Sequence, residues 1–298
     1  MTLPQIHVSP GFADTAALAR ARARARKGVG FHSAGFLHRI AKYDLQDRLS
    51  QINKDFSTSA LITPFPEFWA DMIPNLTVVA PDDTLALQAQ AHDLVIHAMA
   101  LHWAADPVGQ IVQCRRALKP DGVFLAALFG GDTLTELREA LSAVEVAVMG
   151  GISPRIAPMG ELRDMGSLLQ RAGLALPVVD RVGQTVTYSD AFALMHDVRA
   201  MGEINVLSHR HRRIPPRRFF ANAADVYAKN FPAADNPKRI RATFEIIFLA
   251  GWAPHESQQK PLRPGSAITP LAQVLSRAEA NQTPAPVSNT GLTHKAQP

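Results

Sequence analysis

The sequence predicts an α/β protein with a parallel β-sheet at its centre. Two apolar runs, residues 93–99 and 123–129, are too short for ordinary helices and are typical of buried strands. The segment between them, residues 107–119, has the apolar spacing of a helix. Two strands joined by such a helix are parallel, with a right-handed crossover. Ligands of these sheets bind beyond the carboxyl ends of the strands, so we expect a cleft there.

The N-terminal region is expected to form a basic extension, residues 1–30, and a helical segment, residues 31–58. In residues 19–27 arginine alternates with alanine. Both residue types favour a helix, but a two-residue spacing spreads the charges around the cylinder. We therefore expect a frayed, solvent-exposed helix, and a contact with a membrane or nucleic acid is the alternative.

The helix of the central unit has clear start and stop signals. The Asp106 carboxylate can accept a hydrogen bond from an unpaired N–H, and Pro107 suits the first helical position. Basic residues as far as Lys119 crowd the last turn, where the helix dipole favours cations. Pro-Asp-Gly at 120–122 then ends the helix. Cys114 lies on its inner face, so we expect core packing rather than a nucleophile.

The second half departs from simple alternation of strands and helices. Residues 185–188 could form a strand, residues 190–201 have a helical period, and Gly202 ends that helix. Residues 244–250 are expected to form the last buried strand and to close the sheet. Between them, residues 208–220 hold five arginines and two histidines. We interpret this segment as an exposed connector; a landing site for an acidic partner, a phosphate or anionic lipid is the alternative.

Length and composition indicate a soluble globular protein. A chain of 298 residues, 47% hydrophobic and 19% charged, can bury a full core in one domain. A single cysteine excludes an intramolecular disulfide and fits a reducing compartment. No apolar run reaches the roughly 18 residues that span a bilayer. We expect a cytoplasmic protein, with peripheral membrane association as the alternative, and no nucleic-acid partner, because aromatic residues do not interleave the arginines.

Several segments resemble class I S-adenosylmethionine-dependent methyltransferases. The most specific are Leu-His-Trp at 101–103, after the strand, and Leu-Lys-Pro-Asp-Gly at 118–122. Within that superfamily the chain resembles the branch that holds the biotin-synthesis methyltransferase and the methyltransferase-like assembly factor of respiratory complex I. Segments 151–158 and 257–265 favour the assembly-factor side.

This resemblance, which runs from about residue 36 to residue 267, carries an expectation for the whole architecture. It implies a Rossmann-like class I methyltransferase sheet with flanking helices and a helical insertion, about residues 189–240, before the last strand. The methyltransferase-like domain would occupy residues 31–264. Residues 265–298, rich in Pro, Thr, Ser, Gln and Asn, would form a flexible C-terminal tail.

One motif departs from the superfamily pattern. Working enzymes of this superfamily carry an acidic-x-Gly-x-Gly-x-Gly loop after the first strand, because glycine lets the backbone approach the methionine part of the cofactor. The corresponding stretch, residues 59–69, contains no glycine, and Pro64 and Pro66 remove two backbone donors. If Pro64 and Phe65 fill the methionine space, the methyltransferase interpretation loses its cofactor.

The resemblance and the strand ends together indicate the candidate site. Asp82 or Asp83, after the second strand, would hold the ribose hydroxyls of the cofactor. His97 and His102 lie around the end of a strand, where a histidine can bind a ligand or act as a base. The alternative is a histidine satisfied by neighbouring backbone. The candidate cofactor-binding residues are Thr63, Asp82, Asp83, His97, Ala98, Met99 and His102.

Other side chains point less clearly to chemistry. Trp103 could stack on a flat ligand or pack in the core. Arg155 and Arg263 could recognise a carboxylate or phosphate, with surface salt bridges as the alternative. No cysteine cluster or His-Glu-x-x-His motif occurs, so no metal site is expected, and no catalytic residue is identified.

Two functions stay open. The first is an S-adenosylmethionine-dependent methyltransferase that acts on an unknown small-molecule or protein acceptor. The second is an assembly factor for respiratory complex I, non-catalytic or arginine-modifying, that retains the fold and binds a protein of the respiratory chain. Family placement favours the first function, and the missing glycines favour the second.

Overall fold

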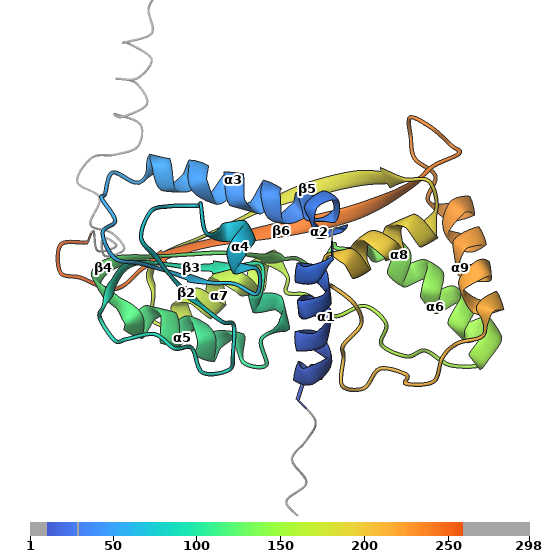
Figure 1. Ribbon diagram of the computed structural model, residues 1–298, viewed down its shortest axis with the longest axis horizontal. Helices are drawn as coiled ribbons and strands as arrows, with labels where there is room; N and C mark the ends of the chain where they lie inside the picture. The colour runs from blue at the N-terminus through green and yellow to red at the C-terminus, as the bar shows by residue number, and fades with distance from the viewer. Residues whose placement is uncertain (1–10, 29, 259–298) are drawn as a thin grey trace, which may run out of the picture. The chain divides into compact units, whose positions relative to one another are not determined.

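A mixed sheet of six strands lies at the centre of the part of the chain that the structure describes, in the order β2-β1-β3-β4-β6-β5 (Figure 1). The structure is a computed structural model and describes residues 11–28 and 30–258. The chain divides into two units, Met1–Glu256 and Ser257–Pro298, and all the elements below lie in the first. The strands are β1 (Ser59–Ile62), β2 (Leu76–Val79), β3 (His92–Ala98), β4 (Leu118–Phe129), β5 (Ala175–Tyr188) and β6 (Ile240–Trp252).

Helices precede, connect and cover these strands. They are α1 (Thr15–Lys27), α2 (Gly30–Ala34), α3 (Phe36–Gln51), α4 (Pro66–Trp69), the 3-10 helix η1 (Leu101–Trp103), α5 (Pro107–Ala117), α6 (Thr135–Met149), α7 (Leu162–Arg171), α8 (Ala191–Ala200) and α9 (Arg217–Asn230). No helix in the described ranges combines the length and the apolar character needed to cross a membrane.

The predicted α/β class is confirmed by the pairing of the strands. β1, β2, β3 and β4 are mutually parallel, and β3 and β4 are joined through α5 as expected. β6 is antiparallel to both β4 and β5. The expected helical insertion before the last strand is present as α8 and α9. Because the parallel strands share one direction, the carboxyl ends of β1, β2 and β3 lie along one edge of the sheet.

The crossover helix begins where the sequence predicts and ends earlier. The Asp106 carboxylate accepts a hydrogen bond from the N–H of Gly109 at 2.8 Å, as a helix cap does. The helix stops at Ala117, and Leu118 is already extended and belongs to β4. The prediction that Lys119 lies in the last helical turn is wrong. The side chain of Leu118 is buried against the sheet, which favours an extended backbone there.

The sheet closes at a different strand from the one predicted. Residues 244–250 lie in β6, the last strand of the described chain, and are mostly buried, as predicted. β6 lies between β4 and β5, so the prediction that this strand closes the sheet is wrong. Both faces of β6 are buried, whereas β5 is half-exposed along its length, with Val178 49% exposed. The short strand predicted at 185–188 is the end of this long edge strand. An edge strand with one solvated face lacks the continuous apolar run that marks a buried one.

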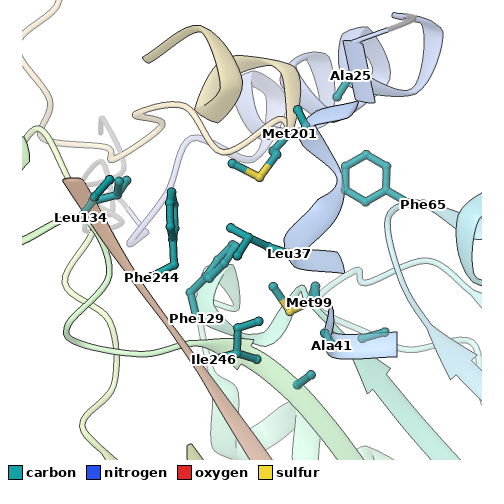
Figure 2. Close-up of a cluster of buried hydrophobic side chains, with 14 of the residues drawn as sticks. Ala25, Leu37, Ala41, Phe65, Met99, Phe129, Leu134, Met201, Phe244 and Ile246 are labelled. Atoms are coloured by element: carbon teal, nitrogen blue, oxygen red, sulfur yellow. The ribbon is translucent and has the colours of Figure 1, made fainter. Parts of the chain in front are cut away.

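Helices cover both faces of the sheet (Figure 1). Each face has its own hydrophobic core. On one face pack α3, α6, α8 and α9. On the other pack α5 and α7, and the free thiol Cys114 is fully buried there, which confirms its predicted core position. Figure 2 shows the larger cluster, where Leu37 of α3 lies close to Phe129 of β4 and Ile246 of β6.

The alternating arginine segment is a packed helix, contrary to the expectation of a frayed one. Asp14 caps α1 by accepting a hydrogen bond from the Ala17 N–H at 2.9 Å. The helix packs against α2 and α8, and it buries Leu18, Ala21, Arg22 and Ala25. Tertiary contacts thus override the spread of charge around the cylinder. The domain boundaries at residues 30 and 264 stay predictions, and the tail 265–298 lies outside the described residues.

Candidate functional site

A cavity of about 470 Å³ lies at the carboxyl ends of β1, β2 and β3, and we call it the strand-end cavity. Its volume falls in the range of about 300–1,000 Å³ that small-molecule sites occupy. The sheet side of its wall is made by Pro64, Pro81, Asp82, Asp83, Ala100 and Trp103. Helix α1 supplies the other wall, including Arg22 and Arg26.

The two predicted aspartates lie in this wall on a segment that α5 holds in place. Gln110 donates a hydrogen bond from Nε2 to the Asp82 carbonyl at 3.1 Å, and Gln113 donates one to the Asp83 carbonyl at 2.9 Å. Both carboxylates are exposed, and neither has a hydrogen bond or ion pair within the described chain. They are therefore free to accept hydrogen bonds from the hydroxyls of a ligand.

His97 is fully buried behind the wall and positions Gln110. Its Nε2 lies 2.8 Å from Oε1 of Gln110. Since the amide nitrogen of Gln110 already donates to Asp82, the oxygen must accept, and His97 carries its proton on Nε2. Burial lowers the pKa of His97 to about 4, so the ring is neutral at pH 7. A side chain, and not neighbouring backbone, bonds Nε2 of this histidine, whereas Nδ1 is buried and has no hydrogen-bond partner among the described residues. His97 acts on the cavity through Gln110.

The other predicted residues from the strand ends also lie beneath the surface of the cavity. Thr63, Ala98 and Met99 are buried, and none of them forms the cavity wall. Met99 has a φ of 51°, a left-handed conformation that few non-glycine residues adopt. Strained residues of this kind cluster at functional sites.

The loop that lacks glycine leaves the cavity open. Pro64 lines the cavity, but Phe65 does not. The Phe65 ring stacks on Phe31 with centroids 4.3 Å apart and joins the hydrophobic core beside Ala25 and Met201 (Figure 2). The sequence raised the possibility that Pro64 and Phe65 together fill this space; the ring of Phe65 packs elsewhere.

A buried carboxylate connects the cavity wall to the insertion. Glu203 accepts a hydrogen bond from Nε1 of Trp103 at 2.6 Å, and the same oxygen, Oε2, lies 3.2 Å from Nε2 of His102. Burial alone would raise the pKa of Glu203, but the His102 and Arg22 charges and these hydrogen bonds lower it to about 2. Its other oxygen, Oε1, is buried and has no hydrogen-bond partner among the described residues.

A second cavity, of about 590 Å³, adjoins this carboxylate, and we call it the apolar cavity. It lies between the sheet and the insertion, and its apolar wall includes Phe129, Leu134, Leu137, Met159, Met195 and Phe220. Glu203 and Arg155 are among its polar lining residues. Trp103 lines both cavities, so the two spaces lie next to each other at this side chain.

Comparison with known proteins now identifies the fold. Residues 28–126 match the family described as a methyltransferase domain. The chain is a methyltransferase-fold protein. It is 42% identical over 193 residues to the protein named arginine-hydroxylase NDUFAF5, mitochondrial, of Dictyostelium discoideum, which covers 65% of this chain and 44% of that one. For the protein of the same name in Mus musculus, the identity is 39% over 202 residues, 68% of this chain and 58% of the relative.

The methyltransferase-fold protein also has relatives named as methyltransferases. It is 34% identical over 171 residues to malonyl-[acyl-carrier protein] O-methyltransferase of Xylella fastidiosa, which covers 57% of this chain and 55% of that protein. In each of these comparisons the chain spans about half the length of the curated relative. Both branches named in the sequence resemblance are thereby confirmed as relatives.

The remaining sequence candidates have mainly structural contacts in this methyltransferase-fold protein. Arg155 donates to Glu145 at 2.7 Å and lies over the Phe219 ring at 4.4 Å, so its charge is already paired inside the fold. Arg263 lies outside the described residues. Among the residues that the structure describes, no three His, Cys, Asp or Glu side chains are grouped as a metal ion would need.

The basic segment between α8 and α9 runs along the surface, as an exposed connector does. Arg210 donates to Asp14 at 2.9 Å and thereby ties the segment to the start of α1. Ile214, in its middle, is 94% exposed.

Sequence reasoning missed the α1 wall of the strand-end cavity. Arg22 and Arg26 belong to an alternating pattern that carries no sign of which arginine turns inward. Gln110 was missed as well, because a glutamine inside a helix has no local signature of its long-range contacts. Asp82 and Asp83 could be predicted because an acidic pair shortly after a strand lies at the ligand-binding edge of the sheet.

Proposed function

We propose that the protein binds S-adenosylmethionine in the strand-end cavity and transfers its methyl group to an acceptor in the apolar cavity. The observation that carries the proposal is the pair of adjoining cavities at the carboxyl ends of the parallel strands, which share Trp103 in their walls. When bound, the cofactor supplies an electrophilic methyl group on a sulfonium. The free carboxylates of Asp82 and Asp83 suit its ribose hydroxyls.

The protein's own residues would mainly position the reactants and exclude water. Gln110, oriented by the neutral His97 ring, holds the segment that carries Asp82. Trp103, fixed by its hydrogen bond to Glu203, forms the partition between the two ligands. The apolar wall of the second cavity favours a nucleophile stripped of water, which raises its reactivity toward a bound electrophile.

Calorimetric titration with S-adenosylmethionine and S-adenosylhomocysteine tests the proposal. We expect binding in the micromolar range, weakened about tenfold or more when Asp82→Asn and Asp83→Asn are combined. Asp225→Asn, an exposed carboxylate on α9, is the matched control and should bind as the unchanged protein does. No heat and no thermal stabilisation at millimolar ligand would overturn the proposal.

A second function, binding or modification of an arginine side chain during assembly of a respiratory complex, has its own support. The relatives named arginine-hydroxylase reach 42% identity, against 34% for those named methyltransferase. The unpaired Oε1 of Glu203 beside the apolar cavity suits a guanidinium group. Titration with an N-acetylated arginine amide tests it: binding that is lost in Glu203→Gln supports this function, and absence of binding removes it.

The partners and the location belong to the same proposal. The family relationship supports a protein of respiratory complex I as the partner, and a small molecule or a protein as the methyl acceptor. We propose a cytoplasmic location, with peripheral contact to a membrane through the basic connector as the alternative. Co-purification of complex I subunits with the tagged full chain would distinguish a protein partner from a small-molecule acceptor.

A further inference from the structure

Arg22 is a buried cation without a hydrogen-bond partner for two of its three nitrogens. The residue is 8% exposed, and Nε and Nη2 have no partner within the described chain. Burial lowers the pKa of Arg22, and the charge of Glu203 opposes that effect. The two side chains do not form an ion pair among the described contacts. Burying an unpaired charge destabilises a fold, which makes the two unpartnered nitrogens candidates for a bond to a ligand.

Arg22 belongs to the wall of the cavity as well as to α1. It lines the strand-end cavity together with Pro64 and Asp82. Its charge also acts on His97, at the carboxyl end of β3. The neighbouring Arg26 lines the same cavity, but it already pairs with Glu67 at 2.5 Å.

Close packing fixes α1 over the cavity. A side chain added at Gly202 would meet the Arg22 Cα at 3.4 Å and the Ala25 Cβ at 3.3 Å, so the helix sits directly on the end of α8. The start of α1 is tied by Asp14 to Arg210. The part of α1 that carries Arg22 is therefore held in place over the cavity.

Residues 64–66, in the loop after β1, offer no free backbone donor at the place where glycine-rich loops bind a cofactor. Pro64 and Pro66 have no N–H, and the Phe65 N–H is used within the loop on Oγ1 of Thr63, at 3.3 Å. An anionic group of a ligand near this loop must find its donors elsewhere. Nε and Nη2 of an arginine form a fork that matches a carboxylate.

We infer that Arg22 binds the carboxylate of the amino-acid end of the cofactor and so replaces the donors that the glycine-free loop lacks. This inference rests on the proposed function. It assigns α1, which precedes the residues matched by the methyltransferase-domain family, to the binding site. The chemical class that Arg22 selects is an adenosyl thioether or sulfonium that carries a free carboxylate.

Two ligands that differ in the carboxylate test the inference. S-adenosylhomocysteine has the amino-acid end, whereas 5′-methylthioadenosine keeps the adenosine and the sulfur without it. Titration of the unchanged protein, of Arg22→Met and of Arg24→Met provides the comparison. Arg24 is an exposed arginine on the same helix and serves as the matched control.

We expect Arg22→Met to weaken the binding of S-adenosylhomocysteine about 10- to 100-fold. The affinity for 5′-methylthioadenosine should stay within about twofold, because only S-adenosylhomocysteine has the carboxylate that Arg22 contacts. Arg24→Met should change neither affinity. Arg22→Lys keeps the charge without the fork, so its affinity for S-adenosylhomocysteine should lie between that of the unchanged protein and that of Arg22→Met. In the unchanged protein, the methyl ester of S-adenosylhomocysteine should bind more weakly than the free acid, a measurement that does not depend on a variant that folds.

The possible failures are distinguishable. Equal loss of both ligands in Arg22→Met, or equal binding of the free acid and its methyl ester, would overturn the role of Arg22 and leave the cofactor site standing. If the unchanged protein binds none of these ligands, the proposed function fails, and the inference fails with it.

Discussion

The stability of the region between the two cavities depends on Glu203. A carboxylate that is buried and ionised requires compensating charges and donors, which here are His102, Trp103 and the nearby Arg22. The pKa of Glu203 lies at about 2, below its ordinary 4.5, so the folded protein binds this proton less tightly than the unfolded chain. Its stabilising contribution is therefore complete above pH 4.5 and disappears as the pH falls toward 2.

Glu203→Gln tests this contribution. We expect the free energy of unfolding to fall by about 3 kcal/mol at pH 7, because the variant removes a buried charge and leaves its partners uncompensated. The difference from the unchanged protein should shrink between pH 4.5 and pH 2, the interval between the ordinary and the folded pKa. Urea unfolding followed by tryptophan fluorescence measures it at each pH.

Glu139→Gln is the control for that experiment, since Glu139 is exposed on α6. It should leave the free energy of unfolding within about 0.5 kcal/mol at every pH. A difference for Glu203→Gln that stays constant from pH 7 to pH 3 would contradict the low pKa of Glu203.

Site residues could be predicted from the sequence where a local signal reports position. Asp82 and Asp83 follow a short apolar run directly, and this places them at the end of a strand. Arg22 and Glu203 have no such signal, because they come from distant segments and acquire their roles only when α1 meets the residues after α8. No local pattern in the sequence indicates the partner of His97 either, because Gln110 contacts it from α5.

At the scale of elements, the crossover unit, which consists of β3, α5 and β4, was predictable because its signals are local. Apolar runs mark β3 and β4, and Asp106 and Pro107 mark the start of α5. β5 was mostly missed because its burial alternates and its edge position gives no continuous apolar run. The packing of α1 was missed because two-residue spacing of arginine is no guide to which face a neighbouring helix covers.

The cap of α5 also has consequences for the site, because α5 carries Gln110 and Gln113 to the aspartate segment. Asp106→Ala should lower the free energy of unfolding by about 1 kcal/mol through loss of the hydrogen bond to the Gly109 N–H. Asp106→Asn keeps an acceptor oxygen and should change stability by less than half as much. Urea midpoints of the two variants measure the difference, and equal midpoints would contradict a capping role.

At the scale of the whole molecule, both cavities draw their walls from elements far apart in sequence. The strand-end cavity combines α1 with the ends of three parallel strands, and the apolar cavity combines the sheet with the insertion. A ligand in the strand-end cavity would therefore hold α1 and the crossover unit together. Binding of this kind stabilises the folded state as a unit and opposes the opening of its core.

Cys114 reports that opening because it is the single cysteine of the sequence. Its thiol is fully buried on the inner face of α5, and burial raises its pKa, so the native protein should react with a thiol reagent only when the crossover unit opens. With S-adenosylhomocysteine at 100 times its dissociation constant, labelling should slow by about 100-fold, since the ligand must leave before the unit opens. Mass spectrometry of the alkylated chain over time measures the rate. The variant that combines Asp82→Asn with Asp83→Asn, at the same ligand concentration, should gain less protection. Labelling of the unliganded native protein as fast as that of the unfolded chain would contradict the buried position of Cys114.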